Sequence, residues 1–148
     1  MSNLESIVIY TDGACRGNPG IGGYGSILTY NGHEKRISGY CSSTTNNRME
    51  ITAVIEAIKC VNRPCHITIY TDSRYVVDAI EKGWLDNWMA NGWKNSSGKP
   101  TKNIDLWKEL RQLMEIHEVE FVWVKGHAGH YYNEECDRMA NVEMDKRS

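Results

Sequence analysis

The chain has 148 residues, a length typical of one domain, and its 41% of hydrophobic residues is enough for a core and excludes wholesale disorder. The formal net charge of −2 excludes a protein that coats nucleic acid with bulk positive charge, so any such contact must be a local patch. No apolar run approaches the ~20 residues of a membrane helix, and the first residues lack the pattern of a signal peptide. The 5 cysteines are odd in number, which favours a reducing cytoplasm over a disulfide framework. We therefore expect one cytoplasmic domain over 1–148, with its core at about 6–146.

The first part of the chain predicts a meander of strands. The Val, Ile and Tyr content of residues 6–12 predicts a strand, which the glycine-rich residues 13–23 are expected to break. Residues 23–30 and 33–41 are predicted strands joined by a tight turn at Asn31-Gly32, a strong hairpin signal.

The rest of the chain alternates helices and strands. Asn46 and Asn47 are expected to cap a helix that ends before Pro64, and Ser73 is expected to cap the next helix. The further predicted elements are strands at 66–71 and 119–124, helices at 73–80, 84–91, 103–117 and 133–146, and an exposed loop at 95–102. Strands separated by helices should be parallel, with right-handed crossovers. This order predicts an α/β fold, in which helices flank a mixed five-stranded sheet of order 3-2-1-4-5 whose first three strands form an antiparallel meander.

Two similar segments, residues 7–13 and 67–73, each carry an aspartate at the end of a predicted strand. If these strands are neighbours, a spacing of ~4.8 Å brings Asp12 and Asp72 together at the carboxyl edge of the sheet, where α/β folds place ligands. Aspartate is also common in turns and caps, which is an alternative for each residue taken alone. The repetition of the segment favours a functional site over two unrelated turn or cap residues.

Two further acids are expected to face this edge. Glu50 precedes Val54 and Ile58 on the inward stripe of its helix, where it is costly unless something satisfies it, although acids are also favoured in a first helical turn. Asp137 lies seven residues before Met144 on the inward side of the last helix, although an ordinary half-exposed acid would fit as well. Oxygen-only ligands suit Mg²⁺ or Mn²⁺, and two such ions can hold the attacking and leaving oxygens of a phosphoryl displacement.

A set of ordered motifs resembles bacterial type 1 ribonuclease H. The motifs lie at residues 11–14, 17–25, 44–50, 70–73, 103–107, 124–127 and 136–137. The resemblance runs from about residue 7 to about residue 142 and implies a ribonuclease H-like fold. It implies an endonuclease that cuts the RNA strand of RNA–DNA hybrids to 3′-hydroxyl and 5′-phosphate ends by a two-metal-ion mechanism. The expected cofactor is Mg²⁺, with Mn²⁺ as a substitute, and the expected state is a monomer with no membrane contact and no obligate protein partner.

The resemblance also implies roles for the acids and for one histidine. Asp12 would contact both metal ions, Glu50 and Asp72 would hold one of them, and Asp137 would hold the other. His127 matches the family's loop histidine, which helps to protonate or release the product, and its titration range suits a proton carrier. The alternatives are an ordinary surface histidine or a zinc ligand, and zinc is disfavoured because no suitably spaced fourth ligand is evident.

Hybrid-binding residues are implied in the same way. The backbone at Cys15, Gly17 and Asn18 would meet ribose 2′-hydroxyls, which distinguish RNA from DNA. Asn46 and Asn47 would read the minor groove on both strands.

Contacts to the DNA strand are implied at two places. Ser43 stands where many relatives carry an arginine, so Thr45 and Asn103 are the candidates for the pocket that holds a DNA phosphate. Trp84 and Trp88 match a protruding, DNA-binding handle, although their spacing fits a packed helix stripe equally well. The handle here lacks several of the basic residues common in that family, with Met89-Ala90-Asn91 in their place.

Two other functions compete with this hypothesis. One is a hybrid-binding module without turnover, although a pure binder gains nothing from clustered negative charge beside phosphates. The other is a nuclease or transferase of the same fold that acts on DNA, against which residues 17–18 and 46–50 favour recognition of RNA.

Overall fold

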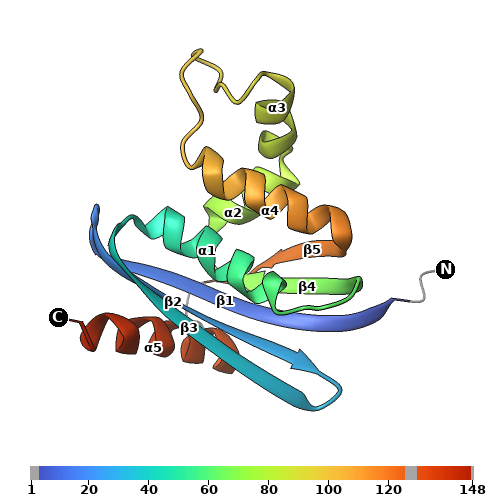
Figure 1. Ribbon diagram of the computed structural model, residues 1–148, viewed down its shortest axis with the longest axis vertical. Coiled ribbons are helices and arrows are strands. Elements are labelled where there is room, and N and C mark those ends of the chain that lie inside the picture. Colours follow the sequence, from blue (N-terminus) through green and yellow to red (C-terminus); the bar gives the residue numbers. More distant parts are fainter. Residues whose placement is uncertain (1–3, 126–129, 148) are drawn as a thin grey trace.

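The computed structural model describes residues 4–125 and 130–147, which form a mixed sheet with helices on both faces (Figure 1). The strands are β1 (Glu5–Gly17), β2 (Gly20–Tyr30), β3 (His33–Thr44), β4 (Cys65–Thr71) and β5 (Glu118–Trp123). The helices are α1 (Asn46–Lys59), α2 (Arg74–Glu81), α3 (Trp84–Ala90), α4 (Ile104–Ile116) and α5 (Tyr131–Asp145). The sheet order is β3-β2-β1-β4-β5, with β1, β2 and β3 antiparallel and β1, β4 and β5 parallel. The predicted sheet order and meander are confirmed.

The glycine-rich segment does not break the first strand, so that prediction is wrong. β1 continues to Gly17 because residues 13–17 pair with residues 20–24 of β2 in antiparallel register. Backbone hydrogen bonds sustain this ladder where β-forming side chains are missing.

The cap of α1 also differs from the prediction. Thr45, rather than Asn46 or Asn47, is the N-cap residue: its backbone is extended and its side chain accepts a hydrogen bond from the amide of Arg48 at 3.2 Å. Asn46 and Asn47 are the first two residues of the helix and are left exposed. Ser73 caps α2 as predicted, accepting from the amide of Val76.

The main core lies between the sheet and the helices α1, α2 and α4. Alternate residues of the central strands, such as Ile9 and Ile69, meet the buried stripe of α1 and the fully buried Trp107 of α4. Helix α5 covers β1, β2 and β3 on the opposite face, where Cys136 packs beside Ile27. In Figure 1, α5 lies alone on its side of the sheet.

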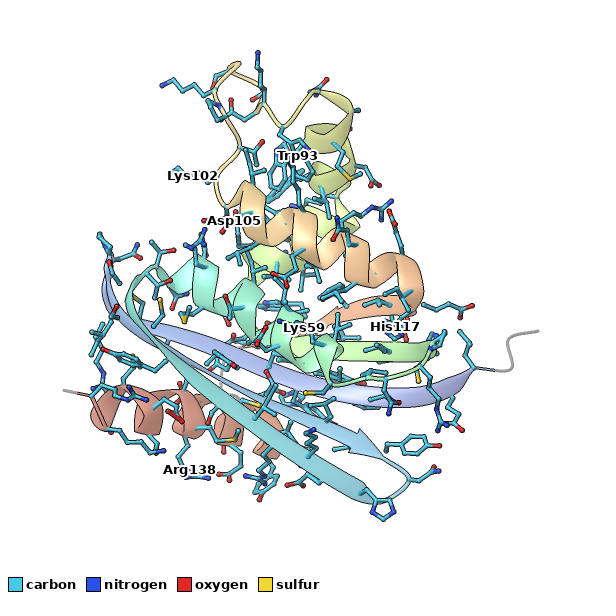
Figure 2. All side chains as sticks on the ribbon, viewed as in Figure 1. Lys59, Trp93, Lys102, Asp105, His117 and Arg138 are labelled. Carbon is cyan, nitrogen blue, oxygen red and sulfur yellow. The ribbon has the colours of Figure 1, made fainter. Side chains whose placement is uncertain are left out.

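A projection formed by α3 and the following loop, residues 84–102, stands beyond α4 and is here called the handle (Figure 1). Figure 2 shows Trp93 where the handle meets α4, with Lys102 projecting outward. The loop at 95–102 is exposed as predicted except at Thr101, which is buried. Within the described residues, no helix combines the length and hydropathy required to cross a membrane.

Candidate active site

Three carboxylates converge at the carboxyl edge of the central strands. Asp12 lies in β1, Asp72 directly follows β4, and these two strands are parallel neighbours with Tyr10 opposite Tyr70. Glu50 reaches the same place from the first turns of α1. One ligand oxygen from each of these acids lies within 4.8 Å of the others. The predicted meeting of Asp12 and Asp72 is therefore found, and Glu50 joins them.

The approach of α1 to β1 depends on Gly13. A Cβ atom at this position would collide with the backbone of Met49 and Glu50. The absence of a side chain lets the Gly13 amide donate a 2.7 Å hydrogen bond to Oε1 of Glu50. The residue next to Asp12 thus fixes the carboxylate that lies beside it.

Asp137 comes to the site from the opposite face of the sheet, on α5. It is not among the three acids within 4.8 Å of one another, but it lies close enough to Asp12 to raise the pKa of that residue. Gly25 of β2 lets α5 come close, because a Cβ there would overlap the carbonyl oxygen of Cys136. Asp12 therefore lies between the pair Glu50 and Asp72 on one side and Asp137 on the other.

The electrostatics of this cluster favour a bound cation. Burial, and after it the charges of Glu50, Asp72 and Asp137, together raise the pKa of Asp12 to about 10. Burial and the charge of Asp72 also raise the pKa of Glu50 well above its ordinary value, against the lowering effect of the Gly13 amide. Carboxyl groups in such a cluster keep protons near neutral pH unless positive charge replaces them. An all-oxygen donor set of this kind fits a hard divalent cation.

The β1–β2 turn and the start of α1 lie side by side. Oδ1 of Asn18 accepts a hydrogen bond from the amide of Asn46 at 3.2 Å. The thiol of Cys15 donates to the carbonyl oxygens of Gly17 and Thr44, at 2.8 and 3.3 Å. The residues expected to contact RNA ribose and the minor groove therefore form one surface, joined by hydrogen bonds.

Asn103 is linked to this surface through Arg48, a residue that sequence reasoning did not assign to the site. Nη1 of Arg48 donates to Oδ1 of Asn103 at 3.3 Å, and its guanidinium forms an ion pair with Asp105 at 2.7 Å. Nδ2 of Asn103 donates to the hydroxyl of Tyr75 at 3.1 Å. Thr45 caps the same helix that carries Arg48, so both candidates for a phosphate pocket adjoin one network. Arg48 belongs to the motif at residues 44–50, but its partners Asn103 and Asp105 are far away in sequence.

The two tryptophans of the handle have different environments. Trp84 is exposed, and its ring lies 6.4 Å from that of Trp88. Trp88 is half-buried and packs 5.7 Å from the ring of the buried Trp107. Trp88 therefore serves packing, while Trp84 offers its ring to the surface. His127 lies outside the described residues.

The sheet and its carboxylate edge together define a metal-dependent phosphoryl-transfer enzyme. A sequence model of the ribonuclease H family matches residues 4–145, and the chain belongs to this family, whose members are metal-dependent endoribonucleases.

Sequence relatives agree with this assignment. The chain is 57% identical to ribonuclease H of Rippkaea orientalis over 136 residues, which cover 92% of this chain and 83% of that protein. It is 53% identical to ribonuclease H of Desulforamulus reducens, over 94% of this chain and 87% of that protein.

Solved structures agree as well. LC9-RNase H1, described as a type 1 RNase H with the type 2 active-site motif, superposes with a TM-score of 0.86 at 33% identity, covering 100% of this chain and 76% of that one. LC11-RNase H1, solved in complex with an RNA/DNA hybrid, gives a TM-score of 0.70 at 25% identity, covering 95% of this chain and 98% of that one.

Proposed function

We propose that this chain hydrolyses the RNA strand of RNA–DNA hybrids at the carboxylate cluster, leaving 3′-hydroxyl and 5′-phosphate ends. The observation that carries the proposal is the convergence of Asp12, Glu50 and Asp72 within 4.8 Å, with Asp137 close enough to raise the pKa of Asp12. The family assignment supports the same reaction.

The cofactor in this proposal is a pair of Mg²⁺ ions, for which Mn²⁺ can substitute. When bound, the ions neutralise the phosphate and stabilise the attacking and leaving oxygens. Asp12 would hold both ions because it lies between the other acids, Glu50 and Asp72 would hold one of them, and Asp137 would hold the other. The Gly13 amide fixes the Glu50 carboxylate before any ion arrives.

Recognition of the hybrid belongs to the surface beside the acids. The backbone at Cys15, Gly17 and Asn18 approaches ribose 2′-hydroxyls, and the exposed Asn46 and Asn47 reach into the minor groove. Asn18 and Asn46 are already linked by a hydrogen bond, so little ordering is needed on binding.

The DNA strand is held at two further places. Thr45 and Asn103, joined through the network of Arg48, receive a DNA phosphate. Trp84 and Trp88 face a hollow of 450 Å³ that Asn91 and Lys94 also line, and this hollow accepts the DNA backbone next to an aromatic ring.

His127 completes the proposal as the group that carries a proton to or from the departing product. Histidine suits that task in general, because its ordinary pKa lies near neutral pH. The chain acts as one domain and as a monomer in the cytoplasm.

The test is an incubation of end-labelled RNA–DNA hybrid, duplex DNA and duplex RNA with the protein and Mg²⁺. Cleavage of the RNA strand in the hybrid alone, with 5′-phosphate ends, is the expected result. Tight hybrid binding without cleavage would identify a binding module instead, and cleavage of duplex DNA would identify a DNA-acting enzyme of the same fold. EDTA should abolish the reaction, and added Mg²⁺ should restore it.

A further inference from the structure

Trp123, the last residue of β5, contacts the backbone at Asp72. Its indole Nε1–H donates a hydrogen bond to the Asp72 carbonyl oxygen at 3.1 Å. Next to it, the amide of Val124 donates to the carbonyl oxygen of Thr71 at 2.9 Å. These two bonds tie the end of β5 to the segment that carries the Asp72 carboxylate. Trp123 is nevertheless 39% exposed, so part of its ring remains open to a neighbouring group.

Arg74 lies over the exposed ring of Trp123. The Cζ atom of its guanidinium is 4.6 Å from the ring centroid, a cation–π contact. Arg74 is the first residue of α2, where the helix dipole disfavours a positive charge, and no acidic residue occupies the first turn of that helix. Within residues 4–125 and 130–147, no carboxylate forms an ion pair with it. An exposed cation is thus held in an unfavourable position, on an aromatic ring, two residues after Asp72.

We propose that Arg74 binds a phosphodiester of the RNA strand adjacent to the one being cleaved, and that Trp123 positions both Arg74 and Asp72. This inference rests on the proposed function, because it takes the scissile phosphate to lie at the carboxylates. The backbone nearest to Asp72 then belongs to the RNA strand. Four acids repel the phosphates that flank the reacting one, and a guanidinium beside them offsets that repulsion. Its planar donors also match two phosphate oxygens at once.

The Arg74→Gln variant tests the phosphate contact. Its KM for hybrid should rise about 3- to 10-fold, with kcat within about 2-fold of the wild type. The dependence of log Kd on log salt should lose about 0.9 units of slope, as expected for one phosphate contact. Arg74→Lys should keep the slope and give an intermediate KM, because it retains the charge and loses the planar fork. Arg147→Gln is the matched control, since Arg147 also lies over an aromatic ring, that of Tyr40 at 4.9 Å, and follows the end of α5 rather than the segment that carries Asp72.

Two variants of Trp123 separate its two contacts. Trp123→Phe keeps a ring for Arg74 and removes the indole N–H from the Asp72 carbonyl. It should lower kcat about 3- to 10-fold and weaken Mn²⁺ binding in calorimetry, with the salt slope unchanged. Trp123→Leu should show both losses. A Trp123→Phe variant with wild-type kcat and wild-type Mn²⁺ affinity would overturn the positioning role.

The phosphate itself is located with hybrids that carry one uncharged methylphosphonate linkage at successive positions of the RNA strand, bound in Ca²⁺. Wild-type protein should lose affinity at one linkage next to the cleavage position, and Arg74→Gln should lose no further affinity there. If each methylphosphonate linkage changes the affinity of Arg74→Gln as it changes that of the wild type, Arg74 does not contact a phosphate of the RNA strand. If wild-type protein binds hybrid without cutting it in Mg²⁺, the proposed function fails. The binding test in Ca²⁺ still shows whether Arg74 contacts a phosphate.

Discussion

The amide nitrogen of Gly13 lies 2.7 Å from Oε1 of Glu50 and donates a hydrogen bond to it, although 37 positions separate the two residues in sequence. This bond joins β1 to α1 directly after Asp12, where the parallel pairing of β1 with β4 has ended. It requires a backbone so close to the helix that no Cβ fits between them. The relative position of two metal-binding candidates thus depends on one glycine.

Gly13→Ala should therefore damage both stability and metal binding. The added methyl group forces α1 away from β1, which should lower the free energy of unfolding by about 1–3 kcal/mol, as overpacking does elsewhere. Urea unfolding and Mn²⁺ calorimetry measure the two effects. Gly32→Ala is the control: Gly32 has a positive φ of 78° and open space around it, so it should lose stability through strain and keep its Mn²⁺ affinity. Wild-type Mn²⁺ affinity in Gly13→Ala would contradict this account.

Asp12→Asn should abolish cleavage and leave hybrid binding measurable. The change is nearly isosteric and removes the carboxylate that lies between the other three acids. Single-turnover cleavage in Mg²⁺ and fluorescence anisotropy with labelled hybrid give the two readouts. Ca²⁺ should occupy the wild-type site and support little cleavage, because its looser and longer coordination misplaces the reacting oxygens. Substantial turnover by folded Asp12→Asn would exclude the proposed ligand set.

The raised pKa of Asp12 predicts how the stability of the metal-free protein depends on pH. Because its pKa is about 10 in the folded state and about 3.9 in the unfolded chain, the folded protein binds more protons between these values. Its stability in EDTA should then decrease as pH rises from 7 to 9, a window above the usual titration of histidine. Calorimetric Tm values across this range provide the measurement.

Two comparisons isolate the cluster in that experiment. Asp12→Asn should have a higher Tm than the wild type in EDTA at the alkaline end, and a flatter pH dependence. Mg²⁺ should raise the wild-type Tm most at the alkaline end, where it has fewer protons to displace. If the Tm values of wild type and Asp12→Asn fall in parallel as pH rises, the carboxylate cluster does not cause the pH dependence of stability.

Much of the acid cluster could be predicted from sequence because it depends on local periodicity. The same short segment with an aspartate is repeated in two parallel neighbours, and this places Asp12 and Asp72 just beyond the last β1–β4 pair, Tyr10 with Tyr70, although β1 itself continues to Gly17. The helical spacing from Val54 to Glu50 predicts an inward carboxylate in the same way, and Glu50 is buried.

Other features depend on register and backbone geometry that a single sequence does not express. Thr45 caps α1 because β3 reaches Thr44 and leaves the next residue extended, whereas asparagine is as good a cap by composition. The contact of Trp123 with Asp72 requires the β4–β5 register, which pairs Thr71 with Trp123. The partners of Arg48 lie on α4 and at the residue before it, beyond any local pattern.

The handle offers a test of its weakly basic surface. Asn91 lines the hollow beside Trp84 and Trp88, whereas Met89 lines a separate one beside Trp93. Asn91→Lys should lower KM for hybrid and steepen the salt dependence of binding by up to about 0.9 log units, with little change in kcat. Met89→Lys adds the same charge on the other side and should change neither. Equal effects of the two lysines would indicate a general gain in charge rather than a contact.

The burial of Cys136 makes the docking of α5 observable. Its thiol is fully buried and donates to the carbonyl oxygen of Tyr10 at 3.3 Å, and burial raises the pKa of this thiol. Since the thiolate is the reactive form, a thiol reagent should modify Cys136 only when α5 lifts from the sheet. In a variant with Cys136 as its sole cysteine, the labelling rate reports the frequency of that opening. Divalent ions that join Asp137 on α5 to Asp12 on β1 should slow the labelling, and an Asp137→Asn substitution should remove that protection.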